Sequence, residues 1–450
     1  MSLLLVEGAT LFAAAVTTVF LWGSPHLLDW IDAARFLGQA VALSLCCILA
    51  FYYNDLYDLR VVRSFAEFAT RLLQGLGVAL LLLAGFYILF PDMRVGDGAL
   101  VPSLLLIVGL LLPIRAVGYA VMRHRAFADR VLILGTGALA RKIVEEIEAR
   151  PHYRYQIVGV TDDGQVDADP PMKYPLFGPV ERLDKIAAEV QADRIIVALT
   201  DRRGHMPMRQ LLEAEAHGIL VEEGMATYEH FAKKLAIEAL SPSYLVFSRG
   251  LRKTSRQLAS RRLVSLVTAA AGLMATAPLL ALIALAIKLD SRGPVFFIHE
   301  RAGYHGRPFR LVKFRTMHGQ PAFGTNAVWY RDDEGRITRV GRWLRKLRFD
   351  ELPQMWNILK GDMDLVGPRP EMVENIKVMA DLIPYYSLRH VVRPGLTGWA
   401  QVRYGYSVSL EQVTEKMRYD LFYIKHMSFW LDLRILVDTL KIALFGRGAK

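Results

Sequence analysis

Two neighbouring carboxylates, Asp350 and Glu351, stand directly before a segment with helical periodicity. Apolar side chains recur at intervals of three and four through residues 352–359, which predicts an amphipathic helix that ends at Gly361. Asp350 is then expected to be the N-cap, where free backbone N–H groups favour phosphate and keep a carboxylate ionised. An ionised aspartate beside a bound phosphate could attack it as a nucleophile. The alternative is a purely structural cap.

A short loop behind the expected helix carries Arg369 between two prolines. The prolines restrict the backbone, so the guanidinium could clamp a phosphate through two parallel hydrogen bonds. A solvated surface arginine is the alternative. Adjacent residues of a regular helix point in different directions, so Asp350 and Glu351 can act together only if the backbone at Asp350 is not helical.

These residues belong to a longer run, residues 348–370, that resembles the bacterial sugar transferase family. Its members are monotopic phosphoglycosyl transferases, which load a sugar phosphate onto a polyprenyl phosphate. Residues 299–301, 313–317, 393–402 and 419–420 match further motifs of the family, although His299 stands where Gln is more common. The chain is most similar to the large form, the polyprenyl-phosphate glycosylphosphotransferases of exopolysaccharide biosynthesis. That form has four N-terminal spans and a Rossmann-like middle domain.

The resemblance implies a two-step reaction in which Asp350 attacks the β-phosphate of a UDP-sugar and releases UMP. The covalent aspartyl phosphosugar then passes to undecaprenyl phosphate, which is the first membrane step of surface glycan assembly. Glu351 is implied to hold Mg²⁺. The cationic residues expected to bind substrate phosphates, or alternatively anionic lipid, are Arg301, Lys313, Arg315, Arg369 and Arg393. Asp420 is a further acidic candidate, with an exposed helix position as the alternative.

Four apolar runs occupy the first quarter of the chain, at residues 3–22, 36–53, 72–90 and 99–122. Each approaches the roughly 20 residues that cross a bilayer. The first lacks a basic start and more spans follow, so it is expected to be a span rather than a signal peptide. Basic residues gather in the second loop and after the fourth run, which places both ends of the bundle, residues 1–125, in the cytoplasm. Arg115, inside the fourth run, must snorkel or face a partner.

Residues 126–237 alternate buried strand patterns, at 130–134, 156–160, 194–198 and 219–222, with helical stretches. This alternation predicts a Rossmann-like α/β middle domain with a parallel sheet. Gly135 and Gly137 follow the first strand and Asp162 and Asp163 follow the second, so the glycines could hold the pyrophosphate, and Asp162 or Asp163 the ribose, of a nucleotide. A domain that keeps the turn and lacks the ligand is equally compatible with this pattern.

A basic linker, residues 238–262, leads into a second kind of membrane segment at residues 263–290. Its apolar run is flanked by basic residues on both sides, so the positive-inside rule places both flanks on one side of the bilayer. Pro278, near the middle, removes a backbone hydrogen bond and is expected to break the helix. We therefore predict a re-entrant hairpin, with a kinked crossing helix as the alternative. Family members typically have Ser where this chain has Ala277.

The last part, residues 291–450, is expected to be an α+β catalytic domain that starts with a strand hairpin. It ends in an amphipathic helix with a polar stripe at Arg434, Asp438 and Lys441, which either lies in the membrane interface or packs on the catalytic core. The fold class is therefore a membrane protein of mixed type. It combines a four-helix transmembrane bundle, a Rossmann-like α/β domain, and a re-entrant helix with an α+β catalytic domain.

The charge of +11, from 55 basic and 44 acidic residues, favours anionic partners such as phosphates and the lipid bilayer. Nucleic acid is not expected, because no zinc-finger or single-strand-binding pattern is present. The two cysteines, Cys46 and Cys47, are adjacent in an apolar run and predict neither a disulfide framework nor a metal site. We expect a bacterial inner-membrane protein with its middle and catalytic domains in the cytoplasm, and a homodimer is compatible with this arrangement.

Two other functions fit parts of the chain. A membrane-anchored NAD-dependent nucleotide-sugar dehydratase or epimerase would also place a Rossmann domain after several spans. Its chemistry needs a Tyr-x-x-x-Lys pair, which this sequence does not contain. A non-catalytic scaffold whose middle domain senses a nucleotide would tolerate the loss of Asp350, Glu351 and Arg369.

Overall fold

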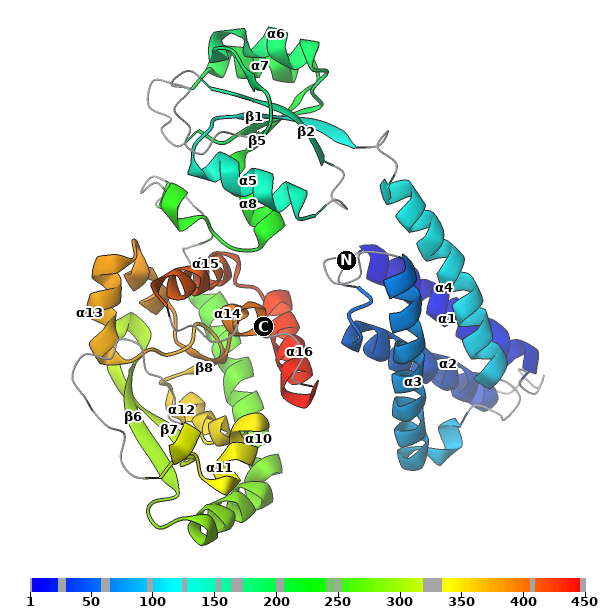
Figure 1. Cartoon of the computed structure of the whole chain (residues 1–450). Coiled ribbons are helices and arrows are strands. Elements are labelled where there is room, and N and C mark those ends of the chain that lie inside the picture. Colours follow the sequence, from blue (N-terminus) through cyan, green and yellow to red (C-terminus); the bar gives the residue numbers. More distant parts are fainter. Residues whose placement is uncertain are drawn as a thin grey trace. The chain divides into compact units, whose positions relative to one another are not determined.

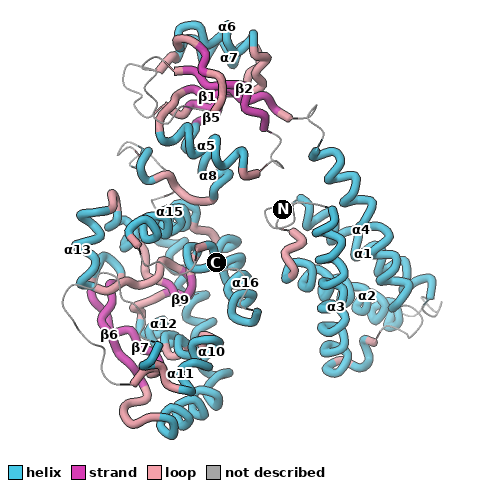
Figure 2. Tube along the Cα trace, viewed as in Figure 1, coloured by secondary structure: helices cyan, strands magenta, loops and turns pink. Residues whose placement is uncertain are grey.

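The structure is a computed structural model. It describes residues 2–22, 30–57, 65–94, 100–123, 128–150, 155–162, 173–199, 206–240, 244–245, 250, 253–318, 334–404 and 409–445. The chain divides into two compact units, Met1–Val131 with Ile147–Ile157, and Leu132–Glu146 with Val158–Lys450. Helices dominate the described residues, and the strands form one five-stranded sheet and two two-stranded sheets (Figure 2).

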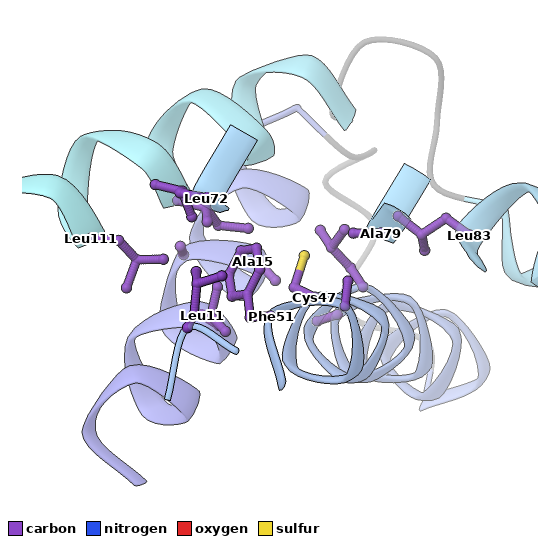
Figure 3. Close-up of a cluster of buried hydrophobic side chains, with 14 of the residues drawn as sticks. Leu11, Ala15, Cys47, Phe51, Leu72, Ala79, Leu83 and Leu111 are labelled. Carbon is purple, nitrogen blue, oxygen red and sulfur yellow. The ribbon is translucent and has the colours of Figure 1, made fainter. Parts of the chain in front are cut away.

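The N-terminal bundle confirms the four predicted helices. They are α1 (Ser2–Trp22), α2 (Trp30–Tyr53), α3 (Phe65–Leu89) and α4 (Leu100–Arg123), with the short 3-10 helix η1 (Pro91–Met93) after α3. Among the described residues, α2, α3, α4 and the later helix α10 are long and apolar enough to cross a membrane. All four bundle helices contribute to one buried core, which includes Leu11, Cys47, Leu72 and Leu111 (Figure 3).

Arg115 faces a partner inside the bundle. Its guanidinium is buried in an ion pair with Glu7 of α1, with 3.2 Å between Nη2 and Oε2, and it donates to the Leu56 carbonyl oxygen at 2.9 Å. A buried charge is tolerated in such a place only when it is paired. The pair therefore joins α1 to α4 beside the end of α2. The sequence did not reveal it, because the two residues lie 108 positions apart.

The middle domain is built on a sheet in the order β3-β2-β1-β4-β5, and both pairings whose register is described, β2–β3 and β4–β5, are parallel. Its strands are β1 (Asp129–Leu134), β2 (Tyr155–Thr161), β3 (Leu176–Phe177), β4 (Arg194–Val197) and β5 (Leu220–Glu223). Its helices are α5 (Ala138–Glu148), η4 (Val180–Arg182), α6 (Leu183–Glu189), α7 (Met208–Ala216), α8 (Gly224–Ala232) and η5 (Ile237–Ala239). Helices α6 and α7 cover one face, and α5 and α8 the other (Figure 1). The predicted α/β domain is confirmed, with the short strand β3 as an addition.

The catalytic domain follows the long helix α10 (Ser255–Asp290). Its strands are β6 (Phe296–Ala302), β7 (Pro308–Phe314), β8 (Asp364–Val366) and β9 (Gly395–Thr397). Its helices are η6 (Tyr304–Gly306), η7 (Glu334–Arg336), α11 (Arg339–Lys346), η8 (Phe349–Glu351), α12 (Gln354–Lys360), α13 (Val373–Leu382), η9 (Tyr386–Val391), α14 (Trp399–Arg403), α15 (Leu410–His426) and α16 (Phe429–Phe445). Strands β6 and β7 form an antiparallel hairpin, and β8 pairs with β9 in parallel.

Helix α10 differs from the predicted hairpin in two ways. It begins at Ser255, capped by Thr254, so it takes in residues 255–262 of the predicted linker. It also continues through Pro278 without an interruption, so the predicted break is wrong, although the helix bends along its course (Figure 1). A proline removes one hydrogen bond of the helical ladder, and packing on both sides can hold the remaining ones in register.

Both halves of α10 pack on the catalytic domain. In the first half, the Ser265 hydroxyl accepts a hydrogen bond from the backbone N–H of Leu365 at 3.1 Å. In the second half, Ile283 and Ile287 join a buried cluster with Phe314. Where the helix lies in a bilayer stays a prediction, as does the placement of its two flanks on one side.

Helix α16 packs against the catalytic core, which was one of its two predicted positions. The Thr439 hydroxyl lies 2.6 Å from that of Thr397 in β9, and Asp438 pairs with Arg403 at 3.7 Å. Large apolar side chains near its start, such as Trp430, stay exposed. Contact with a membrane interface is compatible with that exposure and stays a prediction.

Candidate active site

The β6–β7 hairpin brings two of the predicted cations to one face. Arg301 pairs with Phe309, and Phe297 pairs with Lys313. Residues two apart in a strand share a face, and residues directly opposite each other share it too, so Arg301 and Lys313 point to the same side. The outer edge of β7 is held by Asn357 of α12, which accepts from Val312 N at 3.0 Å and donates to Arg310 O at 2.7 Å. This contact fixes α12 beside the two cations.

Asp350 and Glu351 do not cap α12, which corrects the sequence-based prediction. They lie in the 3-10 helix η8, which follows Arg348 in a left-handed conformation (φ 59°). Helix α12 begins only at Gln354, after Pro353, and ends at Gly361 as predicted. A 3-10 helix has about three residues per turn, so adjacent side chains point about 120° apart. The two carboxylates therefore face different surroundings.

The predicted apolar face of this segment is also not the buried one. Helix α12 buries Gln354, Asn357 and Ile358, whereas Trp356 is 59% exposed. The polar Asn357 is buried because its amide completes the hydrogen bonding of the β7 edge. A tertiary contact of this kind overrides the local apolar periodicity.

Glu351 is held between two cations. Its Oε1 lies 2.9 Å from Lys313 Nζ and 2.9 Å from Arg369 Nη2. Burial alone would raise the pKa of Glu351, but the ion pairs with Arg369 and Lys313 hold it well below its usual range. The side chain therefore stays a carboxylate, and the three groups together carry a net positive charge.

Asp350 lies at the edge of this cluster with an unused oxygen. Its Oδ1 is buried and has no hydrogen-bond partner among the described residues. Burial raises the pKa of Asp350 and the adjacent Glu351 raises it further, while Lys313 acts in the opposite direction. A buried carboxylate oxygen without a donor is costly to keep, so its presence needs an explanation, and a functional role is one.

A buried ionic network holds the backbone of the loop that carries Arg369. Arg389 of η9 donates to the Arg369 carbonyl oxygen at 3.0 Å and pairs with Asp420 of α15 at 2.9 Å. Glu371 accepts from Lys416 at 3.1 Å and forms an ion pair with Arg389 at 3.3 Å. Asp420 is therefore a positioning residue. It is 1% exposed, which corrects the alternative of an exposed helix position.

Sequence analysis missed Glu371, Lys416 and Arg389. Glu371 directly follows the Pro-Arg-Pro step, so extending the matched run by one residue would have found it. No local pattern singles out Lys416 or Arg389, because their partners come from other elements of the fold.

These residues surround a cavity of about 730 Å³. We call its ionic part the charged end, which consists of Arg301, Lys313, Arg348, Arg369 and Lys416 with Glu351 and Glu371. The charged end has an excess of three positive charges and therefore suits a diphosphate. Another part of the lining comes from β9, α14 and α16 and is mostly apolar. Asp350 does not itself line the cavity, although both of its neighbours do.

Two predicted phosphate ligands lie elsewhere. Arg315 donates to the backbone oxygen and the hydroxyl of Ser291, at 2.7 and 2.8 Å, and so ties β7 to the end of α10. Arg393 donates to Gly361 O at 3.1 Å and lies over the Tyr304 ring. Neither lines the cavity, and their predicted role as phosphate ligands stays a prediction.

Comparison with family models assigns residues 256–446, which contain the whole cavity, to the bacterial sugar transferase model. Residues 53–212 match a model described as a CoA-binding domain. A relative from Escherichia coli K12, UDP-glucose:undecaprenyl-phosphate glucose-1-phosphate transferase, is 31% identical over 334 residues, which cover 72% of this chain and 69% of that protein. The chain belongs to the bacterial sugar transferase family. The resemblance found in residues 348–370 is thereby confirmed.

Two further relatives are named for two different sugars. An undecaprenyl-phosphate glucose phosphotransferase of Komagataeibacter xylinus is 33% identical over 354 residues, covering 76% of this chain and 65% of the relative. A UDP-N-acetylgalactosamine-undecaprenyl-phosphate N-acetylgalactosaminephosphotransferase of Aeromonas hydrophila is 46% identical over 173 residues, covering 38% and 41%. The chain thus spans less than two thirds of the length of these two relatives. Family membership alone does not fix the sugar.

The turn at Gly135 and Gly137 in the middle domain, the glycine turn, has a structural explanation. Gly135 has φ +114°, and a Cβ there would lie 2.9 Å from the backbone of Ala198. The backbone N–H of Thr136 donates to Asp162 Oδ2 at 2.7 Å, and the Thr136 hydroxyl bonds the same oxygen. Gly137 directly precedes α5. The predicted nucleotide site at this turn stays a prediction, because the turn is accounted for without a ligand.

The predicted magnesium ion fits the charged end in chemical terms. Mg²⁺ is usually bound by one or two carboxylates together with substrate phosphates and water. Glu351 is ionised, and Asp350 beside it has an unpartnered oxygen. No group of three or more metal-binding side chains occurs among the described residues. A magnesium ion held here would therefore depend on the substrate for most of its remaining ligands.

Proposed function

We propose that this chain transfers a sugar 1-phosphate from a UDP-sugar to undecaprenyl phosphate. The observation that carries the proposal is the ionised Glu351 that Lys313 and Arg369 hold at the charged end of the cavity. Its neighbour Asp350, which does not itself line the cavity, has a buried oxygen without a partner among the described residues. The relatives' names support undecaprenyl phosphate as the acceptor and a UDP-sugar as the donor.

The proposed reaction has two phosphoryl transfers. A carboxylate oxygen of Asp350 attacks the β-phosphorus of the UDP-sugar, and the bond from that phosphorus to the bridging oxygen breaks, so UMP leaves with the bond's electrons. A phosphate oxygen of undecaprenyl phosphate then attacks the phosphorus of the aspartyl phosphosugar. This second step releases the Asp350 carboxylate and gives undecaprenyl-diphosphate sugar. Two successive displacements predict ping-pong kinetics.

The other side chains at the charged end act by charge and position. Arg369 and Lys313 lie where they can stabilise negative charge on the diphosphate, and Arg301 extends the cationic face. Glu351 would hold the magnesium ion together with the substrate phosphates. A bound magnesium ion supplies neutralisation of the diphosphate charge. Asp420 and Arg389 act indirectly, because they hold the backbone that carries Arg369.

The test is a UMP-release assay on detergent-extracted protein with undecaprenyl phosphate, Mg²⁺ and a panel that includes UDP-glucose and UDP-N-acetylgalactosamine. Asp350→Asn keeps the size of the side chain and removes the attacking charge. We expect it to lower turnover by about 10³-fold or more, as losing a nucleophile does. Intact-protein mass spectrometry without acceptor should detect the phosphosugar adduct on the wild type only. Normal turnover or a normal adduct in Asp350→Asn would refute the assignment.

We also propose that α10 is re-entrant and that the catalytic and middle domains face the cytoplasm of the bacterial inner membrane. The support is that both halves of α10 pack on the same domain. In a background with Cys46→Ala and Cys47→Ala, single cysteines at Arg256 and Arg292 should both be labelled only after an impermeant reagent gains access to the cytoplasm. Labelling of one of them from the outside would contradict the proposal. A homodimer is the proposed oligomeric state, and light scattering in detergent measures it.

A further inference from the structure

The lining of the cavity that comes from β9, α14 and α16 has few polar groups. We call it the β9–α16 wall, and its apolar side chains include Leu396, Val402, Leu436 and Leu440. The polar side chains of this wall are Thr397, Gln401 and Thr439. These side chains differ in whether every polar atom has a hydrogen-bond partner within the protein. A buried polar atom that lacks one needs an explanation, and at a cavity a bound ligand can be that explanation.

The hydroxyl groups of both threonines already donate hydrogen bonds within the protein. The Thr439 hydroxyl donates to the Ile435 carbonyl oxygen at 2.6 Å. A hydroxyl has only one proton, so the contact of 2.6 Å between Thr397 and Thr439 must have Thr397 as its donor. The two hydroxyls therefore form a closed chain that ends on the α16 backbone.

Gln401 is different. Its Nε2 donates to the Leu396 carbonyl oxygen at 3.4 Å. Only the nitrogen of an amide can donate to a carbonyl, so this contact sets the orientation of the side chain. Its Oε1 is buried and has no partner among the described residues. The wall thus contains one buried acceptor without a described partner, on a side chain that lines the cavity.

We propose that Gln401 Oε1 accepts a hydrogen bond from an N–H or O–H group in the uncharged part of the nucleotide sugar, an inference that rests on the proposed function. An ionised phosphate has no proton to donate, and neither has a polyprenyl chain. The diphosphate and the lipid acceptor are therefore unsuitable partners. The sugar, through its hydroxyls or an acetamido N–H, and the nucleoside, through its base or ribose, share the required chemistry.

The experiment compares the wild type with Gln401→Met, which keeps the length of the side chain and removes the acceptor. The matched control is Gln412→Met, which changes a glutamine of α15 that does not line the cavity. We expect kcat/KM for the nucleotide sugar to fall about 5- to 100-fold in Gln401→Met, as for the loss of a buried hydrogen bond. The KM for undecaprenyl phosphate should stay within about twofold of the wild type.

Two substrate series then separate the sources of the donor group. One series varies the sugar, as single deoxy analogues on a constant UDP. The other keeps the sugar and varies the nucleoside, with N3-methyl-uracil and 2′-deoxyribose. With the wild type, the analogue that lacks the matching donor group should lower kcat/KM by the same factor as the Gln401→Met substitution. With Gln401→Met, this analogue should lower kcat/KM no further, because the analogue and the substitution remove the same contact. The proposal is overturned if, for every analogue, Gln401→Met loses the full factor of the substitution in addition to the full factor of the analogue. It is also overturned if the substitution changes only the KM for the lipid.

Folding and the proposed function are controlled separately. Gln401→Leu replaces Gln401→Met if the latter does not unfold cooperatively at a temperature close to that of the wild type. If the wild type releases no UMP from any donor, the proposed function fails. If the wild type is active and both Gln401 variants match Gln412→Met on every donor, only the role of Gln401 fails.

Discussion

Two regions of this molecule were predicted from sequence to bind phosphate, and they differ in how their polar side chains are hydrogen-bonded. At the glycine turn of the middle domain, the polar groups bond one another, because Asp162 accepts from both the N–H and the hydroxyl of Thr136. At the cavity of the catalytic domain, buried polar atoms of Asp350, Arg301, Gln354 and Gln401 have no partner among the described residues. At the turn the described side chains bond one another, whereas several side chains of the catalytic domain keep an atom without a described partner.

This difference distinguishes a structural motif from a site. Glycines and a helix start can be required by packing alone, as Gly135 is by its contact with Ala198. Buried polar atoms that lack partners cost free energy, about 1–3 kcal/mol each, and have no structural benefit. The predictions below test whether the cavity and its supports, rather than the turn, respond as a functional site.

The largest effect is expected at the ionic network beneath the cavity. Asp420→Asn removes one of the two carboxylates that pair with the buried Arg389 and leaves only Glu371, so we expect a loss of about 3 kcal/mol in the free energy of unfolding. Denaturant unfolding of the detergent-extracted protein measures it. The control is Glu213→Gln, which breaks an exposed pair with Arg209 and should cost about 1 kcal/mol or less. Equal losses in the two variants would mean that the network does not support the Arg369 loop.

The sequence predicted what local patterns determine. Long apolar runs located the four bundle helices, and strand patterns located β1, β2, β4 and β5. The motif residues Arg301, Lys313 and Arg369 do meet at one cavity. These features depend on neighbours in the chain, or on motifs that a family resemblance supplies.

The rest depended on contacts between distant segments. Glu7 could not be matched with Arg115 from their spacing, nor Arg389 with Asp420. The prediction of an N-cap at Asp350 failed because the backbone there forms the 3-10 helix η8 after the left-handed Arg348, and α12 begins only at Gln354. Gln401 was part of a recognised motif, but only the contact of its amide with Leu396 shows which of its atoms remains free.

At the turn, the expected effect is one of stability. Gly135→Ala forces a Cβ into a left-handed backbone position 2.9 Å from Ala198, which should destabilise the protein by about 1–3 kcal/mol. Gly178→Ala is the control, since no atom lies within 4 Å of its added Cβ. Unfolding should show the difference without added nucleotide. A loss for Gly135→Ala that appears only in the presence of a nucleotide would instead assign the glycine to a ligand site.

At the cavity, the pH dependence of transfer should report the environment of Asp350. Burial and the adjacent Glu351 raise the pKa of Asp350, and the attacking form is the carboxylate. Activity should therefore rise with pH through this raised pKa and fall about tenfold per pH unit below it. Arg345 lowers the same pKa, so Arg345→Gln should move the acid limb of single-turnover UMP release to higher pH. A limb that stays in place, or moves to lower pH, would separate the activity from Asp350.

The smallest effect is expected at Asp162 of the turn. Like Asp350, it is a carboxylate that the sequence predicted to contact a ligand. Asp162→Asn keeps one side-chain oxygen to accept from Thr136 N, so the turn should keep its shape. We expect UMP release to stay within about twofold of the wild type and unfolding to change by about 0.5 kcal/mol or less. Asp350→Asn, the same substitution at the cavity, serves as the comparison. If Asp162→Asn altered turnover as strongly, the turn would have a ligand whose binding controls the catalytic domain, and satisfied hydrogen bonding would no longer distinguish the two regions.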